Sequence, residues 1–242
     1  MLCSNDRSHK FKEKAIANGA FINSYACYDS KNYPLQLRHL QNKPPEFVSK
    51  YRQASGGTGS GLVPLLEDGD SLVIESDVVA KYVATEVEGS DGKGDNLYPE
   101  DQEALIGKFM NKWQDVTDKY YDLLRAINEK DVKKRQTGFV KSLNEIESLL
   151  KESEGPYILG KDFSYCECIS APWIQRFFVT MPYFRGVEFT DLISDMPNVE
   201  VWMKAVCERP SCVESRCPDE EMIAACKKYY VSYLSPNAKG FL

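Results

Sequence analysis

The run from Val63 to Ser76, VPLLEDGDSLVIES, constrains the fold of this chain more than any other stretch. Pro64 has no backbone N–H, so at the head of a strand it must lie at a sheet edge or beside a bound partner, and its bond to Val63 can be cis. The apolar residues on either side of Asp68-Gly69-Asp70 predict two short strands joined by a tight turn. The run therefore predicts a β-hairpin whose first strand enters a core.

The end of the same run predicts the start of a helix. Ser76 is a typical N-cap residue, and the helix that it would cap is expected over residues 77–83. Glu75 lies beside the positive end of this helix. Backbone N–H groups and the dipole at such an end favour an anionic carboxylate. An anionic group is therefore favoured at this helix start, and the alternative is an ordinary hairpin followed by a capped helix.

This arrangement resembles the thioredoxin-like domain of the cytosolic glutathione transferases, in which a Val-Pro pair and an acidic-Ser pair hold glutathione. The resemblance implies that the backbone of Val63, before Pro64, pairs with the cysteinyl part of glutathione. It also implies that Glu75 and Ser76 bind the γ-glutamyl end. The fold implied is an α/β thioredoxin-like N-terminal domain followed by an all-α helical domain, with glutathione as a co-substrate.

Composition and charge exclude several classes of function. The 242 residues are 43% hydrophobic and 27% charged, as in an ordinary globular protein. No apolar run approaches the ~18 residues of a membrane-spanning helix, and the first fourteen residues are too polar for a signal peptide. A net charge of -6 with no basic block argues against nucleic acid as the main partner. We therefore expect a soluble, cytoplasmic protein that binds neither nucleic acid nor membranes.

The cysteines do not indicate a metal site. The chain has eight cysteines and two histidines. Neither the Cys166-x-Cys168 pair nor the recurrence at positions 207, 212 and 217 matches the paired C-x-x-C spacing of zinc sites. Without a secretion signal, reduced thiols are the default. No metal is expected.

The hydrophobic pattern changes near residue 90, from short strand-like runs to long stretches of helical period. The segment GSDGKGD that begins at Gly89 has the composition of a flexible linker. We therefore expect a thioredoxin-like domain over residues 1–88, a linker over 89–101, a helical domain over 102–234 and a tail over 235–242.

Helical periodicity predicts helices over residues 103–127, 131–153, 198–209 and 218–229. Between the second and third of these, Ser164 and Glu167 have the spacing of a capping box. This segment resembles the one that opens the central helix of the glutathione transferase helical domain, with Glu where the family usually has Asp. Five aromatic residues lie on this helix and on the first one: Tyr120, Tyr121, Trp173, Phe177 and Phe178. Some of them could line a pocket for an apolar co-substrate, although most should be core.

Two interpretations compete for the first forty residues, which lack the family's Cys-Pro-Phe motif. In one, a helix begins at Cys3-Ser4 and runs through Ile16, with the second strand over residues 21–28. In the other, residues 35–47 are the second strand and its exit, and Lys43 would reach the glycine end of glutathione. In either case the resemblance implies an atypical or truncated N-terminus.

Cys3 and Ser4 are the catalytic candidates, because the family stabilises a thiolate at the start of its first helix. A Cys3-type enzyme should form mixed disulfides and reduce dehydroascorbate or glutathionylated proteins. A Ser4-type enzyme should conjugate glutathione to electrophiles. For Cys3 the alternative is a terminal thiol without a role, and for Lys43 it is a solvated surface side chain. Cys27 could lie near a strand end, and the alternative is a buried strand residue.

The sequence therefore resembles an omega-like or dehydroascorbate-reductase-like glutathione transferase. Such an enzyme would act in detoxification or redox chemistry on a small apolar or oxidised co-substrate, and the family tends to form homodimers. The alternative is a non-catalytic transferase-like module that binds ligands or serves as a subunit. A chloride-channel-like relative of the omega class would need an apolar, insertion-competent first helix, which residues 11–16 hardly provide.

Overall fold

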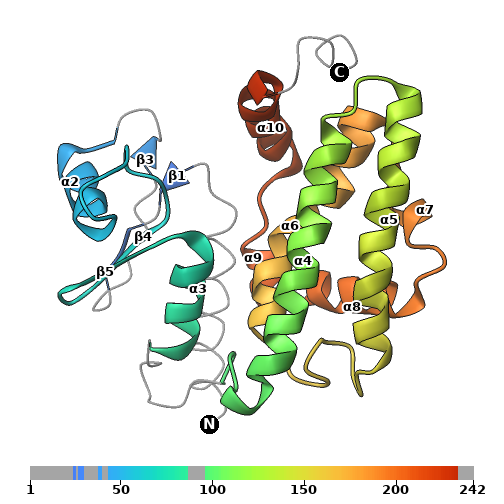
Figure 1. Cartoon of the computed structure of the whole chain (residues 1–242), viewed down its shortest axis with the longest axis horizontal. Helices are drawn as coiled ribbons and strands as arrows, with labels where there is room; N and C mark the ends of the chain where they lie inside the picture. Colours follow the sequence, from blue (N-terminus) through green and yellow to red (C-terminus); the bar gives the residue numbers. More distant parts are fainter. Residues whose placement is uncertain (1–23, 26, 30–37, 40–42, 87–95, 234–242) are drawn as a thin grey trace. The chain divides into compact units, whose positions relative to one another are not determined.

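The computed structural model describes residues 24–25, 27–29, 38–39, 43–86 and 96–233 (Figure 1). The chain divides into two compact units, Met1–Tyr98 and Pro99–Leu242. The division falls between residues 98 and 99, inside the range 89–101 that the sequence assigns to a linker. The outer bounds of the expected domains stay predictions.

The N-terminal unit combines short strands with two helices. Its strands are β1 (Ser24–Tyr25), β2 (Cys27–Asp29), β3 (Arg38–His39), β4 (Leu65–Asp68) and β5 (Ser71–Ile74). Strand β4 is the centre of a three-stranded sheet, with β2 parallel on one side and β5 antiparallel on the other, while β1 pairs with β3. Helices α2 (Pro45–Ala54) and α3 (Ser76–Thr85) both contact β5.

The predicted hairpin is confirmed. Asp68 pairs with Ser71, so Gly69 and Asp70 form a two-residue turn. Gly69 has a φ of 58°, a conformation that the absence of a Cβ makes easy. Leu65 and Leu66, expected to enter a core, are 0% and 1% exposed.

Helix α2 was not predicted, and it corrects one detail of the second interpretation. That interpretation assigns residues 35–47 to a strand and its exit; β3 lies in this range, but α2 begins at Pro45. Proline suits the first turn of a helix because its missing N–H would have no partner there. Phe47 and Tyr51, four residues apart, are buried on one face of α2 and pack with Leu65. The four-residue spacing of Phe47 and Tyr51 suits a helix, because it lets α2 bury both rings against the sheet.

The C-terminal unit is helical and follows the predicted pattern. Its elements are η1 (Glu100–Gln102), α4 (Glu103–Leu124), α5 (Glu129–Lys151), α6 (Tyr165–Arg185), α7 (Phe189–Leu192), α8 (Pro197–Glu208), α9 (Pro210–Glu214) and α10 (Asp219–Tyr233). The four helices expected from periodicity correspond to α4, α5, α8 and α10, whereas the short α7 and α9 were not expected. Helices α4 and α5 lie side by side as the longest pair (Figure 1).

A buried aromatic cluster holds α4, α6 and α8 together. Trp113 of α4 packs edge to face against Trp202 of α8 at 5.6 Å between ring centroids. Phe177 of α6 lies 6.0 Å from Trp113, and all three rings are no more than 2% exposed. Rings of this size contribute much of the apolar area that a helical core buries.

The predicted capping box opens α6 and also joins other parts of the core. Glu167 Oε2 accepts hydrogen bonds from the backbone N–H and the hydroxyl of Ser164 at 2.9 and 2.7 Å. Its Oε1 accepts from Ile158 N at 2.8 Å and from Trp202 Nε1 at 3.1 Å. Glu167 is fully buried. Desolvation raises the pKa of Glu167 above its ordinary value, although its hydrogen bonds oppose the shift.

We predict that Glu167→Gln lowers the free energy of unfolding at pH 7 by about 1–3 kcal/mol, because the amide turns an N–H₂ group toward a buried donor. Because folding raises the pKa of Glu167, the folded state binds a proton on this carboxyl more tightly than the unfolded state does. The stability that the bound proton contributes is present below about pH 4.5, the ordinary value for this group, and is lost as the pH rises through the raised pKa. The difference between the two proteins should therefore be larger at pH 4.5 than at pH 7. Urea denaturation at both pH values measures it.

The matched control is Glu154→Gln, which changes an exposed carboxylate on the preceding loop. This control should alter stability by less than about 0.5 kcal/mol. A Glu167→Gln penalty that grows with pH would contradict the proposed direction of the pKa shift.

Candidate functional site

The hairpin register brings the two ends of the Val63–Ser76 run together. Leu65 of β4 and Ile74 of β5 are directly opposed. Because the chain enters β4 through Val63-Pro64 and leaves β5 through Glu75-Ser76, both pairs lie at the open end of the hairpin. The Val63-Pro64 peptide bond is cis, and Val63 packs against the core of the unit. The two predicted ligand-binding pairs are therefore neighbours.

The backbone turns sharply at Glu75 to begin α3. Glu75 has φ 71° and ψ 129°, a conformation that costs a non-glycine residue energy. Its carbonyl oxygen accepts the hydrogen bond from Val79 N at 2.8 Å. Glu75 is thus the N-cap residue and Ser76 is the first helical residue, so the prediction that Ser76 caps the helix is wrong. The positive φ at Glu75 moves the cap one position earlier.

The start of α3 presents two polar groups to solvent. Glu75 and Ser76 are exposed, and the N-cap side chain makes no capping hydrogen bond to the helix. A helix N-terminus favours a carboxylate group, whereas the Glu75 carboxylate favours a cation. The two preferences occur side by side. This arrangement suits a ligand end that carries an ammonium group and a carboxylate on the same carbon atom, as an α-amino acid does.

Polar contacts at the far end of the hairpin fix both helices to it. Tyr82 of α3 donates a hydrogen bond to Asp68 at 3.1 Å, and desolvation is the main cause that raises the pKa of Tyr82. Lys50 of α2 pairs with Glu67 of β4 at 2.8 Å, and this hydrogen bond is the main cause that raises the pKa of Lys50. These links hold α2 and α3 at their positions on the hairpin without using Glu75 or Ser76.

The other predicted site residues of this unit have different outcomes. Cys27 is in a strand, as expected, and it pairs with Leu65 in the parallel ladder. Its backbone therefore lies at the same end of the sheet as Pro64, which no local pattern in the sequence signals. Lys43 is half-buried, two residues before α2, and its role stays a prediction. Cys3 and Ser4 lie outside the described residues.

The five aromatic residues considered for a co-substrate pocket divide between core and surface. Tyr120 and Phe177 are 0% exposed and belong to the core. Tyr121 and Trp173 are half-buried, and Phe178 is 36% exposed. The expectation that most of the five are core is therefore wrong for this set, because α4 and α6 each turn part of their aromatic surface outward.

The described part of the chain has neither a metal-ligand cluster nor a membrane-spanning helix. There, no group of three or more His, Cys, Asp or Glu side chains could hold a metal ion. None of the described helices combines the length and apolar character that crossing a bilayer requires.

Comparison with known proteins is consistent with this geometry. Residues 118–205 match the family model "Glutathione S-transferase, C-terminal domain". Glutathione S-transferase L2, chloroplastic, of Arabidopsis thaliana is 26% identical over 78% of this chain and 58% of its own length. Probable glutathione S-transferase DHAR1, cytosolic, of Oryza sativa subsp. japonica is 22% identical over 79% of each chain. The chain thus spans less than two thirds of the first of these relatives.

Solved structures show the fold. Glutathione transferase Omega 3C from Trametes versicolor superposes with a TM-score of 0.64 at 16% identity, over 91% of this chain and 97% of that chain. The Tau class enzyme of mango, Mangifera indica, gives 0.63 at 18% identity, over 90% and 93%. The predicted fold, a thioredoxin-like region followed by a helical domain, is confirmed. The matched family model and the relatives named above are all described as glutathione S-transferases.

We predict that the free energy of unfolding is about 1 kcal/mol higher for Glu75→Gly than for Glu75→Ala, because glycine adopts a positive φ without the steric cost that a Cβ brings. Both variants remove the carboxylate, so the comparison isolates the backbone. Urea denaturation of the two proteins measures the difference. Equal stabilities, or a more stable alanine variant, would show that Glu75 carries no backbone strain.

Proposed function

From its glutathione S-transferase fold and its matched C-terminal domain, we propose that this chain is a glutathione transferase that holds glutathione at the open end of the β4–β5 hairpin. The observation that carries the proposal is the juxtaposition of Val63-Pro64 with Glu75-Ser76 at the start of α3. The relatives named above are glutathione S-transferases by description.

The chemistry of glutathione fits this end of the hairpin. The γ-glutamyl end carries a free ammonium and a carboxylate on one carbon atom. The carboxylate would lie at the N-terminus of α3 beside Ser76, and the ammonium would pair with Glu75. The backbone of Val63 would pair with the cysteinyl residue. We further propose that Lys43 binds the glycine carboxylate.

The reaction that we favour is thiol transfer of the omega or dehydroascorbate-reductase type. An enzyme thiolate would attack the sulfur of a glutathionylated substrate, form a mixed disulfide and release the substrate thiolate, which takes a proton from water. Free glutathione thiolate would then regenerate the enzyme thiol and leave as glutathione disulfide. Cys3 is the predicted thiol, and Cys27 is a second candidate because its backbone pairs with Leu65. Ser4 would serve instead in a conjugating enzyme.

A non-catalytic binding module is the second candidate function. The first forty residues lack the family's Cys-Pro-Phe motif, whereas the Glu75-Ser76 pair is present. A chain that keeps the ligand-binding pair without the reactive motif favours this candidate. Such a protein would bind glutathione without turnover. The proposed homodimer and cytoplasmic location apply to either candidate.

We predict that Glu75→Ala and Ser76→Ala each weaken glutathione binding by about tenfold or more, since a lost charge-assisted hydrogen bond costs roughly 1.5–3 kcal/mol. Isothermal titration calorimetry measures the affinity. Asp70→Asn is the matched control, because it changes an exposed carboxylate at the closed end of the same hairpin. Unchanged affinity in both Glu75 and Ser76 variants would overturn the assignment of the pocket.

Turnover separates the two candidate functions. The full chain is assayed for reduction of a glutathionylated peptide and of dehydroascorbate, and for conjugation, alongside Cys3→Ser, Ser4→Ala and Cys27→Ser. We expect one cysteine variant to lose thiol transfer while it keeps its affinity for glutathione. Binding without any turnover in the full chain would instead support the non-catalytic module.

A further inference from the structure

A glycine-rich loop, SGGTGSG at positions 55–61, joins α2 to β4 just before Val63. Two of its glycines lie against aromatic rings of α2. A Cβ on Gly59 would lie 2.6 Å from Tyr51 Cε1, and one on Gly61 would lie 3.1 Å from Phe47 Cε1. Both glycines also have a positive φ, 93° and 80°, which a side chain rarely allows. The path of this 55–61 loop therefore depends on the absence of a side chain at two positions.

The two rings that meet the loop also belong to the core of the unit. Phe47 and Tyr51 are each 5% exposed and form one buried cluster with Leu65 of β4. Val63 packs against the same cluster. Because side chains in a close-packed core have little room to yield, these rings give the loop a firm surface. The same rings therefore contact the loop and support the residue that the loop leads to.

Hydrogen bonds fold the first part of the loop back on the end of α2. Gly57 N donates to Arg52 O at 2.7 Å, and Arg52 Nε donates to Gly59 O at 3.3 Å. The Ser55 hydroxyl donates to Thr58 O, and the Thr58 hydroxyl donates to Ser55 O at 3.2 Å. The hydrogen bonds thus hold the loop as far as Gly59, and the ring contacts hold it from there to the residues before β4.

We propose that Gly59 and Gly61 are positioning residues of the proposed glutathione site. Their close approach to the two rings holds the chain directly before Val63, so that the Val63 backbone is in place for the cysteinyl part before the ligand arrives. A binding group that is already ordered spares the ligand the entropy cost of ordering it, which favours affinity. The inference rests on the proposed function, because Val63 needs to be positioned only if glutathione binds there.

The test is calorimetric titration of the full-length protein and its variants with glutathione. Gly59→Ala should weaken binding by about fivefold or more, the effect of one misaligned backbone hydrogen bond, because the new Cβ meets the Tyr51 ring and displaces the loop. Gly57→Ala is the matched control. Gly57 has the same φ of 93°, but no described residue other than its chain neighbours lies within 4 Å of its Cβ position. Its affinity should change by less than about twofold, whereas a loss caused by backbone strain alone would appear in both variants.

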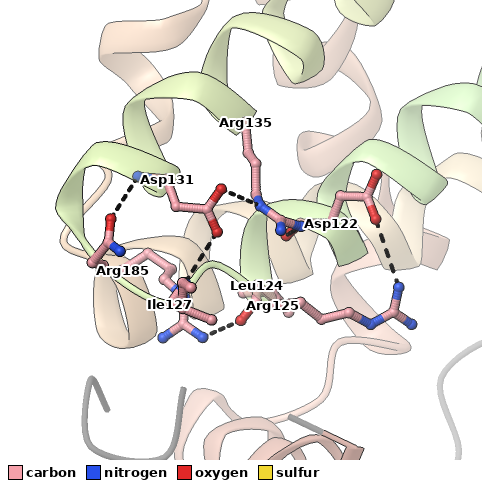
Figure 2. Close-up of polar contacts among 8 residues, drawn as sticks. Asp122, Leu124, Arg125, Ile127, Asp131, Arg135 and Arg185 are labelled. Carbon is pink, nitrogen blue, oxygen red and sulfur yellow. Dashed lines mark hydrogen bonds and ion pairs between the residues drawn. The ribbon is translucent and has the colours of Figure 1, made fainter. Parts of the chain in front are cut away.

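Two further variants test the mechanism and keep the inference testable if Gly59→Ala does not fold. Tyr51→Leu removes the ring, so adding Gly59→Ala to it should weaken glutathione by less than about twofold. Arg52→Gln removes the hydrogen bond to Gly59 O without adding a clash, and it should weaken glutathione by about threefold. Its control is Arg125→Gln, an exposed guanidinium that pairs with Asp122 in the helical unit (Figure 2) and should leave the affinity unchanged. Thermal unfolding confirms that each variant is folded.

A second peptide locates the effect within the ligand. Gly59→Ala should weaken glutathione and cysteinylglycine, which lacks the γ-glutamyl group, by the same factor, because both carry the cysteinyl residue that Val63 would contact. A loss confined to glutathione would contradict the inference. Unchanged affinity in both Gly59→Ala and Arg52→Gln, or equal losses in Gly57→Ala and Gly59→Ala, would overturn it while the unaltered protein still binds glutathione. No binding of glutathione by the unaltered protein would instead overturn the proposed function and this inference together.

Discussion

The register of the β4–β5 ladder is the constraint on which the rest of this account depends. Opposing Leu65 to Ile74 places Pro64 and Glu75 at one end of the hairpin. Leu65 and Leu66 are buried on opposite faces of the sheet, and a slip of one residue would put Pro64 or the charged Glu67 in one of these buried positions, so burial of the leucine pair favours this register. The same burial that stabilises the unit therefore also assembles the proposed glutathione site.

The unit separates the residues that hold the hairpin from those that would bind the ligand. At the closed end, Tyr82 contacts Asp68 and the neighbouring Glu67 pairs with Lys50. At the open end, Glu75 is exposed and adopts a positive φ that only the surrounding structure imposes. Strain of this kind persists where the fold demands it and is concentrated at functional sites. An exposed acidic residue in a costly conformation is therefore a candidate binding residue.

How much of this could be predicted depends on whether the signal is local. The Asp-Gly turn, the leucine pair and the Ser164-x-x-Glu167 box each contain their own physical reason within a few residues, and the structure has all three. The φ of Glu75 could not be predicted, because glutamate gives no local indication of a left-handed conformation. The pairing of Cys27 with Leu65 joins residues 38 positions apart, and short strands carry too little periodicity to reveal such a partner. The contact of Glu167 with Trp202 joins residues 35 positions apart.

The central claim is that the start of α3 recognises the amino-acid end of glutathione. The most direct test is calorimetric titration of the unaltered protein with glutathione and with cysteinylglycine, which lacks the γ-glutamyl group. The account predicts that glutathione binds and that removal of this group weakens binding by at least about tenfold, the effect of the lost carboxylate and ammonium contacts. Equal affinity for the two peptides would contradict it.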